Sequence, residues 1–248
     1  MNLASKIGYL KSEIREGIRV LKREPPITVG EFDLKTLPGL LGKDDPVILD
    51  IGANDGSHTL AFLELFKHAK IYAFEPDPRA LESFRHNVID PRAELFAMAI
   101  ADADGSAEFH LSDGHPPSVE AELRPGGWDL SGSIKKPKKH LEVHPWCTFE
   151  KSQTVTTRRL DSWCEQYAIR SIDLIWADVQ GAEEDLIKGA AKALSRTHYF
   201  YTEYSNEELY ENQITLGRML KLLPGFEVVN RFANDILFQN TRWIAGIE

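Results

Sequence analysis

From residue 46 onward, short apolar runs alternate with stretches of helical composition, and this alternation constrains the fold more than any other feature of the chain. Such a pattern builds strand-helix-strand units, in which parallel strands form one sheet and the helices cover both of its faces. We predict strands at residues 47–51, 71–75, 94–100, 172–178, 198–203, 226–232 and 235–239. We predict helices at residues 58–66, 78–88, 158–168, 182–194 and 206–222. The chain is therefore predicted to have an α/β fold with a doubly wound, mostly parallel, seven-stranded sheet.

The last two predicted strands are joined tightly around Ala233–Asn234, which predicts an antiparallel C-terminal hairpin. With 248 residues and 42% hydrophobic content, the chain is long enough for one large domain, which we place at residues 41–248. Within this domain residues 105–157 are the least regular region, because glycines and prolines break the chain repeatedly. We predict an irregular insertion there, and a loop of this length is usually functional or mobile.

Residues 1–40 are predicted to form a separate N-terminal element, an amphipathic helix followed by a linker. The helix ends before Pro25, and lysines and arginines occupy the face opposite its apolar stripe. The stripe consists of Leu3, Ile7, Leu10, Ile14, Ile18 and Leu21. Three roles are open for this helix: packing on the main domain or on a second subunit of a homodimer, peripheral contact with an anionic membrane surface, or a cap over a bound cofactor.

A turn suited to ligand binding follows the first predicted strand in the run Asp50-Ile-Gly-Ala-Asn-Asp-Gly56. Gly52 and Gly56 allow the backbone to approach a ligand closely, and Asn54 between them tolerates a left-handed conformation. Glu75 ends the second strand, where a carboxylate is placed to accept hydrogen bonds from both hydroxyl groups of a ribose. These two strand ends together predict a nucleoside-binding crevice.

The spacing of the glycines bears on which nucleoside binds. A dinucleotide site needs the pattern G-x-G-x-x-G, whereas this chain has D-x-G-x-x-x-G, with Asp50 two residues before the first glycine. A carboxylate at that point disfavours a pyrophosphate and favours a cation. S-adenosylmethionine carries a sulfonium and an amino group and no phosphate, so Asp50 and Glu75 together fit it. The alternatives are a non-catalytic nucleoside-binding or scaffolding module and a dinucleotide-dependent sugar-modifying enzyme.

Further landmarks follow this crevice in a definite order. They are Ala73-Phe-Glu-Pro76, Ala99-Ile-Ala-Asp102 with Gly105, Leu160-Asp161, Ile172-Asp-Leu-Ile-Trp-Ala-Asp-Val-Gln-Gly-Ala-Glu183 with Gly189-Ala190, and Thr202-Glu203. Together with the first turn they resemble the FkbM-type S-adenosylmethionine-dependent methyltransferases, and the resemblance covers roughly residues 46–240. It implies a class I methyltransferase (Rossmann-like) fold and O-methylation, usually of a sugar or polyketide-like hydroxyl group.

The chain departs from that family at one landmark. Family members commonly read Lys-x-Asp-Val-Glu-Gly where this chain has Trp176 in place of the lysine and Gln180 in place of the glutamate. The roles of the family's lysine and glutamate are therefore in doubt here. The departure suggests a distinct subgroup with its own acceptor.

The candidate cofactor-binding residues come from the landmarks around the predicted crevice. They are Asp50, Gly52, Ala53, Asn54, Gly56, Thr59, Glu75, Pro76, Asp102 and Asp178. Asp102 follows the third strand and precedes Gly105, so it is placed to accept a hydrogen bond from the adenine amino group. A plain turn aspartate is the competing interpretation.

Asp178 and Glu203 are the candidate catalytic residues, because they end neighbouring predicted strands and ligands bind beyond such ends. Methyl transfer is an in-line displacement, so a hydroxyl group must be aligned and must lose its proton as charge develops. A carboxylate base achieves this, as does a divalent metal that lowers the pKa of the hydroxyl, and both residues serve either scheme. Further candidates are Gln180, Glu183, Asn206 and His58, with structural roles as the alternative for Glu183 and His58.

A run of basic residues within the insertion bears on the acceptor. It consists of Lys135, Lys136, Lys138, Lys139 and His140. So much positive charge in an acidic chain suggests an anionic small-molecule or glycan acceptor, with the insertion as a lid over it. A solvated loop is the alternative interpretation. Nearby aromatic residues, Trp128, Trp146 and Phe149, either stack on a sugar ring or anchor the loop, and we favour anchoring.

Composition limits the remaining function classes. A net charge of −9 argues against general binding to nucleic acid, whose phosphates attract basic surfaces. No apolar run approaches the roughly 20 residues that cross a membrane, and the N-terminus lacks the uninterrupted hydrophobic segment of a secretory signal. Cys147 and Cys164 form no C-x-x-C pair, so neither a disulfide framework nor a zinc site is expected. A cytoplasmic chain is the simplest expectation.

Overall fold

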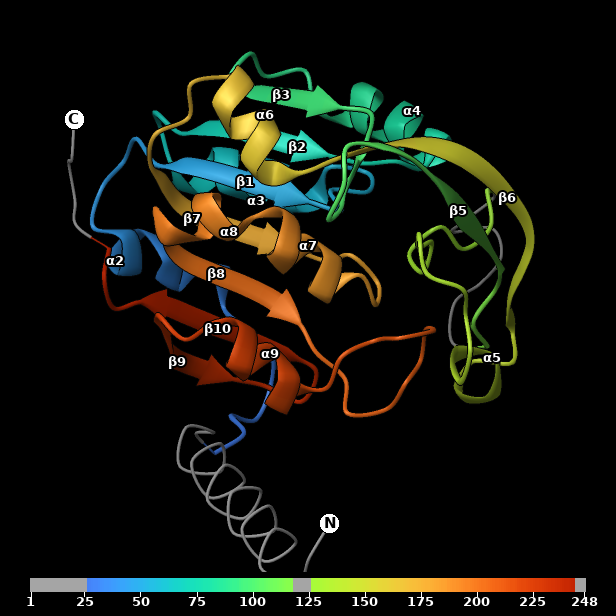
Figure 1. Cartoon of the computed structure of the whole chain (residues 1–248). Coiled ribbons are helices and arrows are strands. Elements are labelled where there is room, and N and C mark those ends of the chain that lie inside the picture. The colour runs from blue at the N-terminus through green and yellow to red at the C-terminus, as the bar shows by residue number, and fades with distance from the viewer. Residues whose placement is uncertain (1–25, 118–125, 244–248) are drawn as a thin grey trace, which may run out of the picture.

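The computed structural model describes residues 26–117 and 126–243, and its centre is one seven-stranded sheet (Figure 1). The strand order is β3-β2-β1-β7-β8-β10-β9. The strands are β1 (Val47–Ile51), β2 (Lys70–Phe74), β3 (Ala93–Phe96), β7 (Ile172–Ala177), β8 (Thr197–Glu203), β9 (Phe226–Arg231) and β10 (Asp235–Asn240). The neighbours from β3 to β8 pair in parallel, whereas β10 is antiparallel to both β8 and β9. The predicted doubly wound sheet with a C-terminal antiparallel hairpin is confirmed.

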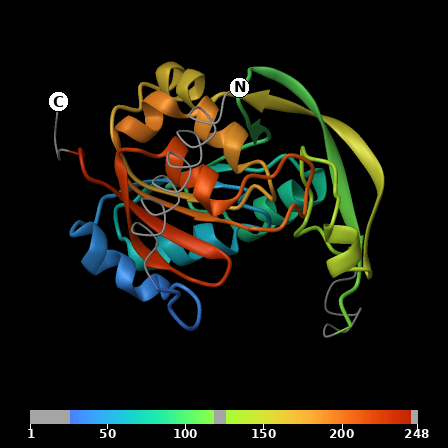
Figure 2. The same cartoon turned by 60° about the horizontal axis from the view of Figure 1, so that its bottom comes forward.

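Helices cover both faces of this sheet. One face carries α6 (Leu160–Gln166), α7 (Glu183–Gly189), α8 (Ala191–Ser195) and α9 (Leu216–Leu222). The other carries η1 (Leu34–Thr36), α2 (Leu37–Leu41), α3 (Ser57–Leu65) and α4 (Pro78–Asn87), and the turned view shows the resulting layers (Figure 2). Successive strand residues point to opposite faces, so Ile48 joins the core under α2 and α3, while Leu49 joins the core under α6 to α9.

The chain diverges from the sequence prediction where local hydrogen bonds compete with regular structure. The helix predicted at residues 206–222 begins only at Leu216, because side chains satisfy the backbone before it. Gln213 Oε1 accepts hydrogen bonds from the amides of Leu209 and Tyr210, and Asn206 Oδ1 accepts one from Leu216. The strand predicted at residues 94–100 is split, since β4 (Ala99–Ile100) leaves the main sheet for a second one.

The insertion is more regular than predicted. It contains two long antiparallel strands, β5 (Gly105–Gly114) and β6 (Cys147–Arg158), which form a second sheet with β4 in the order β4-β6-β5. The prediction of an irregular insertion over residues 105–157 is therefore wrong for these strands. The polar composition of β6 makes this strand hard to recognise in the sequence, because most of its side chains are exposed or half-buried on both faces. Among the described residues of the insertion, the irregular part is the connection at 115–117 and 126–146, which includes α5 (His140–Val143).

The N-terminal helix predicted within residues 1–40 falls largely outside the described residues, which begin at residue 26. Its three open roles therefore stay predictions. Among the described residues, every helix is too short or too polar to cross a membrane.

The turns after β1 and β7 pack against each other, backbone to backbone. Gly52 has a φ of +81°, and a Cβ built on it would lie 1.8 Å from the carbonyl oxygen of Asp178. The amide of Asp178 in turn donates to the carbonyl of Ile51 at 2.8 Å. Gly56 packs against α4 in the same way, because a Cβ there would lie 2.4 Å from Val88. These glycines therefore allow close approach of the chain to itself.

We expect Gly52→Ala to force the two turns apart and to lower the free energy of unfolding by about 2 kcal/mol or more. Urea denaturation measures this change. Gly39→Ala is the matched control, because nothing lies within 4 Å of a Cβ at that position. Equal stability of the two variants would contradict the steric argument.

Candidate functional site

An inner cavity lies at the carboxyl ends of β1, β2 and β7, where ligands bind in sheets of this kind. Its volume is about 590 Å³ measured to its open mouth. Five of the predicted cofactor-binding residues line it: Gly52, Asn54, Glu75, Pro76 and Asp178. The rest of the lining is mostly apolar and includes Ile51, Phe74, Met98, Ile100, Phe109 and Val179. The cavity therefore joins a polar edge to an apolar slot.

Glu75 is held rigidly at the polar edge. Its carboxylate is 5% exposed and accepts hydrogen bonds from the amides of Asn54 at 2.9 Å and Asp77 at 2.7 Å. Burial raises the pKa of Glu75 to about 8, although these two hydrogen bonds act in the opposite direction. Asn54 occupies the left-handed conformation that the sequence predicted, with a φ of +44°. The turn after β1 thus orients the carboxylate that ends β2.

The insertion forms the roof of the inner cavity through residues 129–134. Asn54 Nδ2 donates to the carbonyl of Asp129 at 3.3 Å, and the hydroxyl of Ser133 donates to the carbonyl of Gln180 at 2.7 Å. Gly132 packs closely on Phe109, because a Cβ there would lie 2.7 Å from the ring. The sequence predicted a lid here but none of these residues, because no motif marks them.

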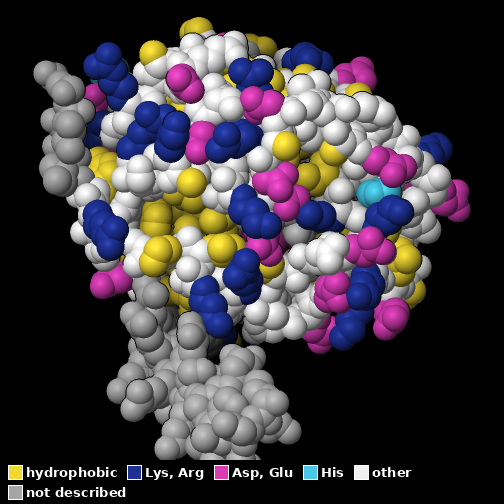
Figure 3. Space-filling model, in the orientation of Figure 1, with side chains coloured by type: hydrophobic (Ala, Val, Ile, Leu, Met, Phe, Trp, Pro, Cys, Tyr) yellow, Lys and Arg dark blue, Asp and Glu magenta, His cyan; other side chains and the backbone are white. Residues whose placement is uncertain are grey.

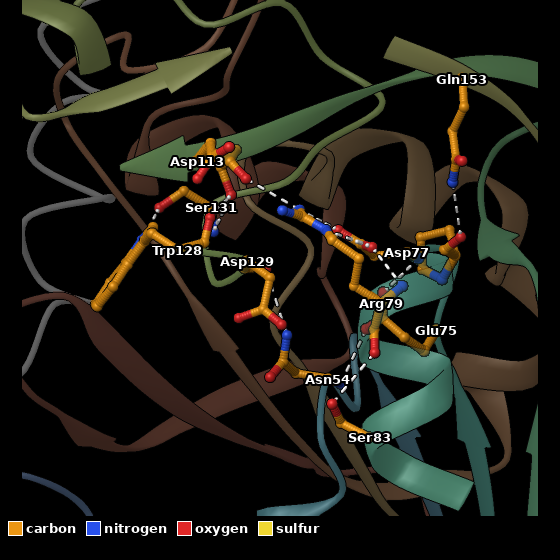
Figure 4. Close-up of polar contacts among 12 residues, drawn as sticks. Asn54, Glu75, Asp77, Arg79, Ser83, Asp113, Trp128, Asp129, Ser131 and Gln153 are labelled. Carbon is orange, nitrogen blue, oxygen red and sulfur yellow. Dashed lines mark hydrogen bonds and ion pairs between the residues drawn. The ribbon is translucent and has the colours of Figure 1, made fainter. Parts of the chain in front are cut away.

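Arg79 links the insertion to Asp77, which lies two residues after Glu75 (Figure 4). Its guanidinium donates to both carboxylate oxygens of Asp77, at 3.1 and 2.6 Å, and to the carbonyl of Ser112 at 2.9 Å. Ser112 then donates to the carbonyl of Trp128, whose indole donates to Ser131 at 2.9 Å. Trp128 therefore anchors the insertion, as the sequence analysis favoured.

Five predicted cofactor-binding residues lie outside the lining of the inner cavity. They are Asp50, Ala53, Gly56, Thr59 and Asp102. Asp50 is buried beneath the turn, where it accepts a hydrogen bond from the hydroxyl of Thr59 at 2.6 Å. Burial and the nearby charge of Asp178 raise the pKa of Asp50 to about 7. Asp102 is exposed, and the cavity is bordered instead by Met98, Ala99 and Ile100.

The two candidate catalytic carboxylates are brought together by Gln180. Its side-chain amide donates to Asp178 at 2.6 Å and to Glu203 at 3.1 Å, and its oxygen lies 3.0 Å from the hydroxyl of Tyr210. Burial raises the pKa of Asp178 to about 6 and that of Glu203 well above its ordinary value. Asp178 raises the pKa of Glu203 further by repulsion. Ionisation of one acid of the pair therefore disfavours ionisation of the other.

An outer cleft lies on the other side of Asp178. It is lined by Glu31, Phe32, Leu34, His58, Trp176, Ala177, Asp178, Tyr201, Glu203 and Asp235. Its volume is about 720 Å³ measured to its open mouth. Asp178 lines both the inner cavity and the outer cleft, so its carboxylate stands at the boundary between them.

The other candidates have structural partners. Glu183 is buried and accepts a hydrogen bond from the amide of Gly181 at 3.0 Å, and Asn206 caps α9. The ring of His58 lies 4.9 Å from that of Trp176, and burial lowers the pKa of His58. Within the described part of the chain, no group of three or more His, Cys, Asp or Glu side chains is arranged to hold a metal ion.

The basic run in the insertion is largely paired with carboxylates. Lys135 bonds to Asp185 at 2.6 Å, Lys138 pairs with Glu208, and Lys139 lies 3.9 Å from Glu207. None of these lysines lines the inner cavity or the outer cleft. On the face that carries α6 to α9, basic and acidic side chains are likewise interspersed (Figure 3). The structure therefore gives the anionic acceptor no support.

Comparison with known proteins identifies relatives over most of the chain. A family model for the methyltransferase FkbM domain matches residues 50–232. The 2-O-methyltransferase NoeI of Sinorhizobium fredii (strain NBRC 101917 / NGR234) is 48% identical over 214 residues, which are 84% of this chain and 85% of that protein. Methyltransferase 1 of Beauveria bassiana (strain ARSEF 2860) is 25% identical over 59% of both chains. The crystal structure of methyltransferase FkbM from Methylobacillus flagellatus KT matches at 12% identity with a TM-score of 0.49, over 79% of this chain and 44% of that one.

The buried acids of the site predict how stability depends on pH. A carboxyl group whose pKa is raised in the folded state loses its proton there at a pH where the unfolded chain is already ionised, so folding becomes less favourable as pH rises. The pKa values of Asp50 and Glu183 are raised to about 7 and that of Glu75 to about 8. The unfolded chain ionises these groups near pH 4, whereas the folded chain keeps their protons until about pH 7 to 8, so we expect the free energy of unfolding of the ligand-free protein to fall between about pH 4 and pH 8 and then to level off.

Denaturation at several pH values measures this slope, and Glu75→Gln is expected to flatten it whatever its effect on absolute stability. Glu82→Gln is the matched control, because Glu82 is exposed on α4. A slope that is the same in Glu75→Gln as in the control would show that Glu75 does not titrate in this range.

Proposed function

The chain belongs to the FkbM methyltransferase family and is an S-adenosylmethionine-dependent O-methyltransferase, and we propose that its acceptor is a hydroxyl group of a sugar. The family assignment favours an enzyme over the scaffolding module and the dinucleotide-dependent enzyme that the sequence left open. Likeness to a 2-O-methyltransferase over most of both chains supports position 2 of the sugar ring as the site of methylation.

The inner cavity fits the cofactor. When bound, S-adenosylmethionine supplies an electrophilic methyl group on a positively charged sulfur. Glu75 is placed to accept hydrogen bonds from the ribose hydroxyls, and the apolar slot beside Met98, Ile100 and Phe109 suits the adenine ring. Asp178 also lines this cavity, where its carboxylate favours a cation, whereas Asp50 lies beneath the turn and outside the lining.

The observation that carries the proposal is the position of Asp178 between the inner cavity and the outer cleft. A group that removes a proton from the acceptor must reach both the methyl donor and the hydroxyl group. Because Asp178 lines both the inner cavity and the outer cleft, whereas Glu203 lines only the outer cleft, we assign Asp178 as the general base. With the cofactor bound, its methyl group would be transferred to the acceptor hydroxyl, and Asp178 is placed to take up the proton that this hydroxyl loses. Glu203 holds Gln180 in place, and no step is assigned to a metal, because the described side chains form no suitable ligand group.

Methyl transfer from isotope-labelled S-adenosylmethionine to a panel of glycosides tests the proposed function, and NMR of the product locates the methyl ether. We expect a methyl group on the oxygen at position 2 of a sugar ring. Efficient transfer to hydroxyl compounds other than sugars, with no transfer to any glycoside, would overturn the sugar assignment.

Asp178→Asn tests the assignment of the base. We expect kcat to fall by about 100-fold or more. The Kd for S-adenosylmethionine, measured by calorimetry, should change by less than about ten-fold, because Glu75 and the apolar slot are intact. Asp90→Asn is the matched control, since Asp90 lies in the loop before β3, paired with Arg92 and outside both cavities. Unchanged turnover in Asp178→Asn would remove the assignment.

Gln180→Glu tests how the carboxylate pair is tuned. The substitution removes the two amide donors that favour ionised Asp178 and Glu203 and adds a third acid between them. The pKa of Asp178 should rise above about 6, so the acidic limb of the kcat/KM profile should move to higher pH by about one unit. Gln166→Glu is an isosteric control on α6, where the side chain accepts a hydrogen bond from Arg158. An unshifted limb would show that Gln180 does not set this pKa.

A further inference from the structure

Aromatic side chains form one wall of the outer cleft. The rings of Trp176 on β7 and Tyr201 on β8 are stacked, with centroids 3.7 Å apart and an interplanar angle of 9°. Phe32 lies 6.0 Å from Trp176 and 5.6 Å from Tyr201, and His58 on α3 packs on the other side of Trp176. Trp176 stands where the resemblance leads one to expect a lysine, so an aromatic surface replaces a positive charge.

Acidic side chains form the rest of the cleft's polar lining. They are Glu31, Asp178, Glu203 and Asp235. The other ionisable groups in the lining are His58, which burial keeps neutral to lower pH, and Tyr201, whose hydroxyl bonds to Asp235. Among the described residues that line the cleft there is no lysine or arginine. An anionic ligand would therefore meet repulsion without a cation to receive it.

We propose that the outer cleft binds the acceptor and that the unit held there is an uncharged sugar ring. The apolar C–H face of such a ring packs against the half-buried Phe32 and the small exposed part of Trp176, and its hydroxyl groups donate to the carboxylates of the lining. Asp178, shared with the inner cavity, receives the hydroxyl that is methylated. This assignment rests on the proposed function, and it replaces the anionic acceptor suggested by the basic run with an acceptor that carries no carboxylate or phosphate on the bound ring.

The test uses matched acceptors that differ only in charge. Methyl glycosides of gluco, galacto and manno configuration are compared with the corresponding uronic acids, and kcat/KM is measured with labelled S-adenosylmethionine. We expect kcat/KM for each neutral glycoside that is a substrate to exceed that of its uronic acid by about ten-fold or more. Uronic acids that are methylated equally well or better would overturn the proposal.

Glu31→Lys locates the discrimination in the cleft. Glu31 lies at the exposed rim, so the substitution places a cation there without disturbing the core. We expect the preference for the neutral glycoside to shrink by about three-fold or more. Glu227→Lys makes the same change of charge at an exposed site on β9 outside the cleft, and it should leave the preference unaltered. The same shift in both variants, or in neither, would contradict a local origin.

A binding measurement separates this inference from the proposed function. The indole N–H signal of Trp176, assigned by loss in Trp176→Phe, is followed by NMR in the enzyme saturated with S-adenosylhomocysteine while each glycoside is added. A shift caused by neutral glycosides and not by uronic acids supports the cleft even if none of the sugars is methylated, in which case the proposed function fails alone. The absence of any shift with glycosides that are methylated would overturn the cleft and leave the proposed function standing.

Discussion

The contact between the turns after β1 and β7 determines the geometry of the whole site. Gly52 lies against the carbonyl of Asp178, and the amide of Asp178 bonds to Ile51, so the two strand ends are locked at backbone level. A side chain at position 52 would separate them. Because Asp178 is part of this contact, its carboxylate is held between the inner cavity and the outer cleft. The arrangement of the two cavities around Asp178 therefore depends on this one close approach.

The buried acids of the site then limit which ligands the inner cavity and the outer cleft can bind. Asp50, Glu75, Asp178, Glu183 and Glu203 all have raised pKa values, and burial is the largest cause in each case. Buried acids of this kind are costly until a cation or a hydrogen-bond donor reaches them. A positively charged cofactor and the hydroxyl groups of the proposed sugar acceptor would supply these partners. The amide of Gln180 already supplies two donors, whereas the glutamate expected from the resemblance would add another acid.

The sequence predicted the elements whose signal is local and missed those that depend on distant partners. Apolar runs identified the seven strands of the main sheet, and the carboxylates at the ends of β2, β7 and β8 line the two cavities as expected. The burial of Asp50 beneath the turn was not predicted, because sequence spacing does not show that the hydroxyl of Thr59 donates to its carboxylate. Asp161 is a landmark without a predicted role, and in the structure its carboxylate accepts the amides of Lys192 and Ala193 at the start of α8. The roof residues of the insertion had no detectable motif, since their position depends on contacts with Asn54 and Gln180.

The two departures from the family pattern fall on opposite sides of Asp178, and the structure gives each a distinct consequence. Trp176 lines the outer cleft, and the lysine expected from the resemblance, with its positive charge, is absent at this position. Gln180 faces the inner cavity, joins the carboxylate pair, and receives the hydroxyl of Ser133 from the roof on its carbonyl. Tyr210, from the loop before α9, lies within hydrogen-bond distance of both the Gln180 side chain and the carbonyl of Ser131. Gln180 therefore links the roof of the inner cavity, the carboxylate pair and the loop before α9, so under the proposed mechanism a change of residue there would affect cofactor enclosure and proton transfer together.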